Sequence, residues 1–294
     1  MEHTFYLVDV FAEGRYSGNQ LAVFRNASSL SVEDMRHLAR EVHFSETAFI
    51  LSDEPRDGGF DLRVFTPLEE IPFSGHAVLG AAWVLQRELM HRPVDSIRFN
   101  LGAGSVQADL VYRYGGIDTV WVNHLPPQFL ACPSLDSVAA AIGLDVSEID
   151  TRWPVQEVST GLCFAMVPLR SLLSVRRAKV VADALSALTA STAIRALYLF
   201  ASETYDAGND FHARMFAPSF GIPEDPATGA GAGCLVAYAL RYLHPDRDAI
   251  DARIEQGYEV RRPSILFARG ARSDGGLSIT VGGRVMMAAQ GHFV

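Results

Sequence analysis

Three polar side chains stand beside apolar stretches of this chain, and each could take part in proton transfer. Glu46 lies among aromatic residues, and a carboxyl group in apolar surroundings has a raised pKa that suits reversible proton transfer near neutral pH. His76 stands at the expected start of an apolar helix, and Asp225 lies a few residues before a second such helix. These residue types indicate general acid–base chemistry.

Each of the three residues also has a structural interpretation that the sequence leaves open. Glu46 could cap a turn or pair with an arginine, and from the residues alone this is the more frequent outcome for a charged side chain. His76 could be a core histidine that is hydrogen-bonded to backbone. Asp225 could be a plain helix cap, because Asp is favoured at that position.

The starts of the two apolar helices predict a site for an anion. A helix N-terminus offers free backbone N–H groups and the positive end of the helix dipole. Gly75, Thr228 and Gly229 stand at these starts and could bind a substrate carboxylate through backbone N–H and hydroxyl groups. Asn19, which ends an early loop, is a further candidate for substrate binding.

The chain contains an internal repeat. Residues 60–67 read FDLRVFTP and residues 211–218 read FHARMFAP, so that Phe, Arg, Phe and Pro recur 151 residues apart. In this alignment Ile71-Pro72 matches Ile222-Pro223, and three extra residues then follow in the second copy before a small-residue apolar stretch. A repeat of about half the chain indicates duplicated domains, because solenoid and propeller periods are shorter, roughly 20–50 residues.

The expected elements belong to an α+β fold. The apolar helices that begin at Gly75 and Gly229 contain few or no charges, and a helix that is apolar all round is buried. We therefore expect two similar domains, each a barrel-like curved β-sheet around a central buried helix, with residues 1–126 in the first and 127–282 in the second. The expected strands are 4–11, 21–24, 48–51, 60–65, 97–99, 105–110, 119–122, 162–167, 196–200, 264–268, 277–281 and 285–288, and the expected helices are 31–42, 75–89, 134–142, 178–189 and 229–240.

Composition narrows the classes of function. The net charge of −9 argues against nucleic acid, which needs clustered Lys and Arg. Three cysteines without a CxxC pair fit a reducing compartment, and no signal peptide or apolar run long enough to span a membrane is visible. No metal cluster, Walker loop or dinucleotide fingerprint is present. We expect a cytoplasmic protein that uses neither cofactor nor metal.

Five stretches of the chain together resemble the phenazine-biosynthesis PhzF-like family of the diaminopimelate-epimerase superfamily. They are VDVFAEGRYSGNQLAVF, EVHFSETAFI, RVFTPLEEIPFSGHAVLGAAW, RMFAPSFGIPEDPATGAGAG and EQGYEVRRPS, and they cover most of the chain. The resemblance implies two barrel-like domains with the active site between them, and a homodimer. It also implies that the last strand, about 283–294, can return to the first domain.

The resemblance assigns roles to the candidate residues. Glu46 matches the family's catalytic acid/base in its SET motif, His76 the histidine of PFxGH, and Asp225 the aspartate of EDxxTG. The chain departs from the family at Ala230, where relatives often have Ser, and at Gln20, where many have Pro. Identity of its substrate with that of the phenazine enzyme does not follow from the resemblance.

Thiol chemistry is disfavoured. Two-base amino-acid epimerases of this fold use thiols at the two helix starts, whereas this chain has Ser74 and Asp225-Pro226-Ala227 in those regions. Cys234 lies inside the second helix and is expected to be a small core residue. The favoured function is a cofactor-independent isomerase acting on a small carboxylated substrate. The alternatives are a non-thiol amino-acid epimerase or racemase, and a non-catalytic protein that binds carboxylates.

Overall fold

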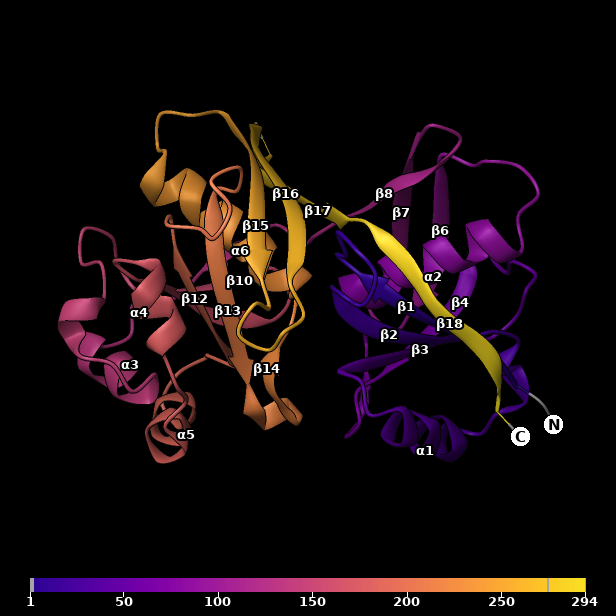
Figure 1. The fold of residues 1–294 in the computed structure, drawn as a ribbon, viewed down its shortest axis with the longest axis horizontal. Coiled ribbons are helices and arrows are strands. Elements are labelled where there is room, and N and C mark those ends of the chain that lie inside the picture. The colour runs from indigo at the N-terminus through magenta and orange to yellow at the C-terminus, as the bar shows by residue number, and fades with distance from the viewer. Residues whose placement is uncertain (1–2, 274, 294) are drawn as a thin grey trace. The chain divides into compact units, whose positions relative to one another are not determined.

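The structure of the protein is a computed structural model that describes residues 3–273 and 275–293 (Figure 1). The chain forms two compact units. The first unit contains the described residues up to Asn123 and from Gly282 onward, and the second unit is His124–Val281. Within the described ranges, no helix is long and apolar enough to cross a membrane.

The first unit is a sheet with a buried helix. Its strands are β1 (His3–Val10), β2 (Asn19–Phe24), β3 (Glu46–Ile50), β4 (Phe60–Phe65), β5 (Glu70–Ile71), β6 (Ser96–Leu101), β7 (Gly104–Arg113), β8 (Gly116–Asn123) and β18 (Val285–Phe293), and its helices are η1 (Ala27–Ser29), α1 (Val32–Val42) and α2 (Gly75–Glu88). The strand order is β18–β1–β2–β3–β4–β6–β7–β8, antiparallel except for the parallel pairs β2–β3 and β4–β6. Figure 1 shows β18, at the yellow end of the chain, beside the indigo β1.

The second unit has the same kinds of element. Its strands are β9 (Gln128–Phe129), β10 (Gln156–Ser159), β11 (Cys163–Pro168), β12 (Ala196–Ala201), β13 (Phe211–Ala217), β14 (Ile222–Asp225), β15 (Ala249–Gln256), β16 (Ser264–Ser273) and β17 (Gly276–Gly283), which ends at the boundary. Its helices are α3 (Leu135–Ala141), η2 (Val146–Glu148), α4 (Leu172–Arg177), α5 (Ala182–Ala190), η3 (Pro218–Phe220), α6 (Gly229–Tyr238) and a π-helical turn, η4 (Ala239–Leu243). The paired strands run β9–β10–β11–β12–β13–β15–β16, antiparallel except for β11–β12 and β13–β15.

The two sheets match strand for strand. The series β1–β2–β3–β4–β6–β7 corresponds to β10–β11–β12–β13–β15–β16, with parallel pairs at the same two places. In each unit a helix precedes the strand that closes the second parallel pair: α2 before β6, and α6 before β15. The predicted α+β class and the duplication are confirmed.

Each central helix is buried because the curved sheet surrounds it. In the first unit α2 contacts β1, β2, β3, β7, β8 and β18, and in the second α6 contacts β10, β11, β15 and β16. Small residues allow this close approach. A Cβ atom on Gly80 of α2 would lie 2.4 Å from Leu21 Cδ2, so a larger residue there would force the Leu21 side chain to shift.

The two central helices differ in residue size at one position, and the residue at the corresponding place in a neighbouring strand differs in the opposite direction. On α6, a Cβ atom at Gly231 would lie 2.3 Å from the buried ring of Tyr198 in β12. In the first unit the corresponding residues are Ala77 of α2 and Ala48 of β3, since Ala48 faces Val64 as Tyr198 faces Met215. The large Tyr198 ring of the second unit is thus accommodated by Gly231, which is smaller than its counterpart Ala77.

Strand pairing corrects our alignment of the repeats beyond the first eight residues. Val64 faces Ile71 across β4–β5, and its counterpart Met215 faces Asp225 across β13–β14. Asp225 therefore corresponds to Ile71, at an offset of 154 residues, and the extra residues lie before β14. The sequence alignment matched Ile71 with Ile222 because both precede a proline, and it had no information on strand pairing.

A repeated ion pair supports the corrected alignment. Arg63 Nε and Nη2 donate to the Glu70 oxygens at 2.7 and 2.6 Å. Arg214, 151 residues later, donates in the same way to Glu224 at 2.8 and 2.7 Å. Bidentate arginine–carboxylate pairs are directional as well as strong, so each pair fixes the short strand that leads to its central helix.

The predicted first helix is confirmed, with Ser31 accepting from Asp34 N at 3.1 Å as its cap. The helix expected over 178–189 is found as α5, which begins only at Ala182, and the preceding helix α4 was not predicted. Arg214 Nη1 donates hydrogen bonds to the backbone carbonyls of Val175, Arg176 and Ala178. Helix α4 ends at these residues, where its last carbonyls have no partner within the helix. Strand β15 was not predicted.

The fit between Gly231 and Tyr198 can be tested by Gly231→Ala. An exposed helix would gain about 1 kcal/mol from this change. Here the new methyl group overpacks against the Tyr198 ring, so we expect a net loss of roughly 1–3 kcal/mol in the free energy of unfolding, measured by urea denaturation. Gly14→Ala, with no atom within 4 Å of the added Cβ, is the control and should be nearly neutral. Increased stability of Gly231→Ala would contradict the packing described.

Candidate active site

Glu46 begins β3, where it faces Leu21 of the parallel strand β2. Its side chain is 17% exposed, although the following residues of the strand are buried. The carboxylate therefore lies at the end of a buried strand with limited access to solvent.

Two side chains from the start of α2 converge on one oxygen of Glu46. Ser74, the N-cap residue, donates a short hydrogen bond from its hydroxyl to Glu46 Oε2. His76 Nδ1 lies 3.1 Å from the same Oε2. The Ser74 hydroxyl also accepts from Ala77 N at 3.3 Å, which directs its proton toward the carboxylate.

This arrangement makes the two oxygens of Glu46 different. Oε2 is held by a hydroxyl and an imidazole, both from the first residues of one buried helix. In the part of the chain that the structure describes, no hydrogen bond to Oε1 is found. The two hydrogen bonds to Oε2 therefore fix the orientation of the carboxylate.

Asn19 and Gly75 lie close to this cluster in the fold. Asn19 begins β2, is 3% exposed, and accepts a hydrogen bond at 3.1 Å from Ser45, the residue before Glu46. Gly75 is the first residue of α2, a position whose N–H has no acceptor within the helix. The structure therefore groups Asn19, Glu46, Gly75 and His76 within the first unit.

The second unit carries the other predicted residues. Asp225 ends β14 and is 6% exposed, so it is not the helix cap that the sequence left open. The N-cap of α6 is Thr228, whose hydroxyl donates to Asp225 Oδ2 at 2.6 Å and does not cap the helix. Gly229 is the first helical residue.

In both units the hydroxyl of the helix N-cap donates to a carboxylate, but the carboxylates come from different places. Ser74 and Thr228 correspond in the corrected alignment, 154 residues apart. The position that corresponds to Glu46 is Ala196, and the position that corresponds to Asp225 is Ile71. The carboxylates that accept from the two N-cap hydroxyls therefore occupy non-equivalent positions of the duplicated scaffold.

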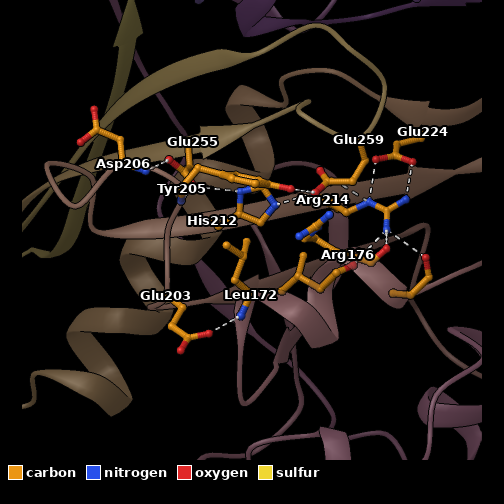
Figure 2. A network of polar contacts seen from close by, with 12 residues as sticks. Leu172, Arg176, Glu203, Tyr205, Asp206, His212, Arg214, Glu224, Glu255 and Glu259 are labelled. Atoms are coloured by element: carbon orange, nitrogen blue, oxygen red, sulfur yellow. Dashed lines mark hydrogen bonds and ion pairs between the residues drawn. The ribbon is translucent and has the colours of Figure 1, made fainter.

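A buried histidine lies between two glutamates in the second unit (Figure 2). His212 is fully buried, with Nδ1 3.1 Å from Glu255 Oε1 and Nε2 3.3 Å from Glu259 Oε1. Glu255 also accepts from the backbone N–H groups of Tyr205 and Asp206 and from the amide of Asn209. This network ties the loop between β12 and β13 to β15.

The charges of this network shift its pKa values. Burial by itself lowers the pKa of His212, but hydrogen bonds to Glu255 and Glu259 outweigh it, and the pKa is raised. Burial raises the pKa of both glutamates, but the His212 hydrogen bond and other contacts reverse this, and both are lowered. These directions favour the charged form of each of the three groups over the neutral form.

The two buried cysteines are poor nucleophiles. Burial raises the pKa of Cys234 to about 12 and that of Cys163 to about 11. Cys234 lies within α6, where its thiol donates to Val158 O at 3.5 Å, as expected for a core residue. Among the described residues, no group of three or more His, Cys, Asp or Glu side chains is arranged to hold a metal ion.

With one buried helix inside the curved sheet of each unit, the protein belongs to the class of α+β proteins with the diaminopimelate-epimerase-like fold. Its family follows from comparison with known proteins. The model of the phenazine biosynthesis-like protein family matches residues 8–291, and the chain belongs to that family.

Curated relatives of the chain are isomerases. A trans-2,3-dihydro-3-hydroxyanthranilate isomerase of Pseudomonas fluorescens is 32% identical over 272 residues, which cover 91% of this chain and 90% of that protein. The enzyme of the same name from Pseudomonas chlororaphis is 31% identical, with 99% of both chains covered. The chain is accordingly an isomerase of the PhzF-like type.

Solved structures agree on the fold. A PhzF-family phenazine biosynthesis protein of Bacillus anthracis has a TM-score of 0.93 at 24% identity and covers 100% of this chain and 99% of its own. A predicted epimerase of Pseudomonas aeruginosa has a TM-score of 0.84 at 30% identity, with 99% of both chains covered. A probable proline racemase of Agrobacterium radiobacter, at 13% identity and a TM-score of 0.64, covers 99% of this chain and 93% of its own and shares the fold.

Sequence reasoning missed several polar residues around the predicted ones. Ser74 was noted as part of a motif but not as a partner of Glu46, although its place before a helix start is a cap signal. Gln256, which contacts the turn between Asp225 and Thr228, lies in the quoted stretch EQGYEVRRPS but was given no role, because it ends a strand that was not predicted. His212 and Glu255 are also 43 residues apart in the chain.

The His212 network predicts how stability depends on pH. The raised pKa of His212 gives a contribution that is complete below its ordinary value of 6.5 and is lost as pH rises through the folded value. The lowered pKa values of Glu255 and Glu259 give contributions that are complete above 4.5 and are lost as pH falls through the folded values. The free energy of unfolding from this network should therefore be highest between pH 4.5 and 6.5.

Urea denaturation of His212→Asn across this range tests the network. The variant should lose stability overall and should show a weaker decline above pH 6.5 than the unmodified protein. His37→Asn, which changes a histidine with a 62% exposed side chain, is the control and should keep the original decline. Equal slopes above pH 6.5 in the unmodified protein and His212→Asn would contradict the assignment.

Proposed function

We propose that the protein is a cofactor-independent isomerase that moves a proton on the carbon skeleton of a small carboxylated substrate, with Glu46 as the general acid/base. The observation that carries this proposal is the convergence of Ser74 and His76 on Glu46 Oε2. That convergence orients the carboxylate and leaves Oε1 to exchange a proton. The family and its curated isomerases support the assignment.

The proposed reaction balances without a co-reactant. Glu46 takes a proton from a substrate carbon, and the electron pair of the broken C–H bond shifts the adjacent double bond. The protonated Glu46 then returns a proton to the carbon at the other end of the shifted system. His76 and Ser74 hold the carboxylate in place and stabilise its charge when it is ionised.

We propose that the backbone N–H group of Gly75, at the start of α2, helps to bind the substrate carboxylate, with Asn19 as a further polar contact. Gly229, at the start of α6, offers an N–H group of the same kind in the second unit. Helix N-termini favour anions through their unpaired N–H groups and their dipole. Asp225 is proposed as a further group that accepts or guides a proton. The Thr228 hydroxyl, which donates to Asp225, acts on this carboxylate rather than on the substrate.

The family relationship leads to further proposals. We propose that the two compact units are the two domains expected from the repeat, and that the protein works in biosynthesis as a homodimer in the cytoplasm. The three cysteines, all free, suit a reducing compartment. Light scattering coupled to size-exclusion chromatography tests the dimer, and a mass of 32.1 kDa, that of one chain, would contradict it.

The role of Glu46 is tested by proton NMR in deuterated water with trans-2,3-dihydro-3-hydroxyanthranilate and a panel of related cyclic and amino carboxylic acids. The protein should incorporate deuterium or move a double bond in at least one compound, and Glu46→Gln should lower that rate by about 10²- to 10⁴-fold. Glu54→Gln, at an exposed carboxylate of the same unit, is the matched control and should retain the rate.

The same spectra distinguish the competing functions. Deuterium at a stereocentre with loss of optical rotation and no movement of a double bond would favour an epimerase or racemase. Ligand binding without any proton exchange would favour a non-catalytic carboxylate-binding protein. A fully active Glu46→Gln variant with an intact fold would reject the assigned role.

A mechanism without thiols predicts resistance to alkylation. Iodoacetamide at neutral pH should modify the exposed Cys132 and leave Cys163 and Cys234 unmodified, because burial raises the pKa of both and excludes the reagent. The rate of proton exchange should be unchanged, with mass spectrometry reporting the sites of modification. Loss of activity in step with modification of Cys234 would instead indicate thiol chemistry.

A further inference from the structure

A fully buried glutamine connects both ends of the turn that carries Asp225. Gln256, the last residue of β15, has no exposed surface. Its Nε2 donates to Asp225 O at 2.8 Å and to Thr228 Oγ1 at 3.2 Å. Its Oε1 accepts from Thr228 N at 3.3 Å and from the Tyr198 hydroxyl at 3.2 Å.

The chemistry of the partners fixes the direction of every hydrogen bond. Asp225 O is a carbonyl and only accepts, whereas Thr228 N–H only donates, so the amide of Gln256 can be oriented in one way only. Thr228 Oγ1 must then accept from Gln256 Nε2. Its single proton is left for Asp225 Oδ2, 2.6 Å away.

Tyr198 is the first donor in this chain of hydrogen bonds. Burial raises the pKa of its hydroxyl, so the group stays protonated and donates to Gln256 Oε1. The hydrogen bonds therefore run in one direction, from Tyr198 through Gln256 and Thr228 to the Asp225 carboxylate. Bonds arranged in this way polarise one another.

The first unit has none of these groups at the corresponding positions. Gln256 follows Glu255, which corresponds to Asn100 of β6, so its counterpart is Leu101. Tyr198 corresponds to Ala48, and Asp225 to Ile71. Gln256, Tyr198 and Asp225 therefore have apolar counterparts in the first unit. The scaffold that the two units share does not require these polar residues.

We propose that Gln256 is the positioning residue for Asp225: by accepting from Tyr198 and donating to Thr228, it directs the Thr228 hydroxyl proton onto the Asp225 carboxylate and fixes where that carboxylate points. A Thr228 hydroxyl that pointed elsewhere would leave Asp225 without this donor. The effect on catalysis rests on the proposed function, but the hydrogen-bond geometry does not.

Proton NMR of the Thr228 hydroxyl tests the geometry without any substrate. The buried, hydrogen-bonded proton should give a slowly exchanging resonance, assigned by its absence in Thr228→Val and its counterpart in Thr228→Ser. In Gln256→Leu, which introduces the residue found at the corresponding position of the first unit, the resonance should disappear or exchange with water at least about tenfold faster. Tyr238→Phe removes another buried tyrosine hydroxyl, which donates to Pro154 O at 2.7 Å, and should leave the resonance unchanged.

Kinetics on whichever compound the protein turns over tests the consequence for catalysis. Per folded molecule, Gln256→Leu should lower kcat by about 10- to 100-fold with little change in KM, while Tyr238→Phe should match the unmodified protein. An unchanged Thr228 resonance or an unchanged kcat in Gln256→Leu would overturn the proposal. If Gln256→Leu does not fold, Tyr198→Phe tests the proposal in its place. A Thr228 resonance identical to that of the unmodified protein would then contradict a chain of hydrogen bonds that runs from Tyr198 to Asp225.

These two measurements separate the proposal from the proposed function. If the unmodified protein turns over no compound but the Thr228 resonance behaves as expected, the proposed function fails while the positioning by Gln256 stands. If turnover depends on Glu46 but not on Gln256, the proposed function stands and the positioning role is rejected.

Discussion

The burial of one helix inside each curved sheet is the constraint on which the rest of this structure depends. A helix surrounded by strands must have small residues where the strands approach, as at Gly80 against Leu21 and Gly231 against Tyr198. It must also satisfy the polar groups of its first turn without access to bulk water. In the first unit the Ser74 hydroxyl accepts from Ala77 N, and in the second Gln256 Oε1 accepts from Thr228 N.

The duplicated scaffold leads to an asymmetric set of reactive groups. Each helix start brings a hydroxyl to a carboxylate, but Glu46 comes from the beginning of one strand and Asp225 from the end of another. Their counterparts, Ala196 and Ile71, are apolar. A repeated fold can therefore supply two chemically different environments while it keeps the packing that makes each helix start rigid.

The buried polar residues of the second unit are satisfied as networks. His212 and Glu255 occupy the places that Asp61 and Asn100 occupy in the first unit, where the Asn100 amide donates to Asp61 at 3.0 Å. A carboxylate–amide pair in the first unit is thus replaced by a histidine–glutamate pair in the second. Removal of one partner from such a buried charged pair is costly, and this ties the conformation of β15 to the His212 network and to Gln256 at its end.

The sequence by itself determined the fold class, the duplication, the buried helices and three of the residues around which the proposed site is built. These properties depend on local patterns: apolar periodicity, small-residue composition, an internal repeat, and motifs that resemble a family. Tertiary structure alone decided which residues meet. The insertion before β14, the partnership of Ser74 with Glu46, and the connection from Tyr198 to Asp225 through Gln256 all depend on strand pairing between distant segments. Hydrogen bonds between residues far apart in the chain leave no periodic signal in the sequence, so only the folded arrangement shows them.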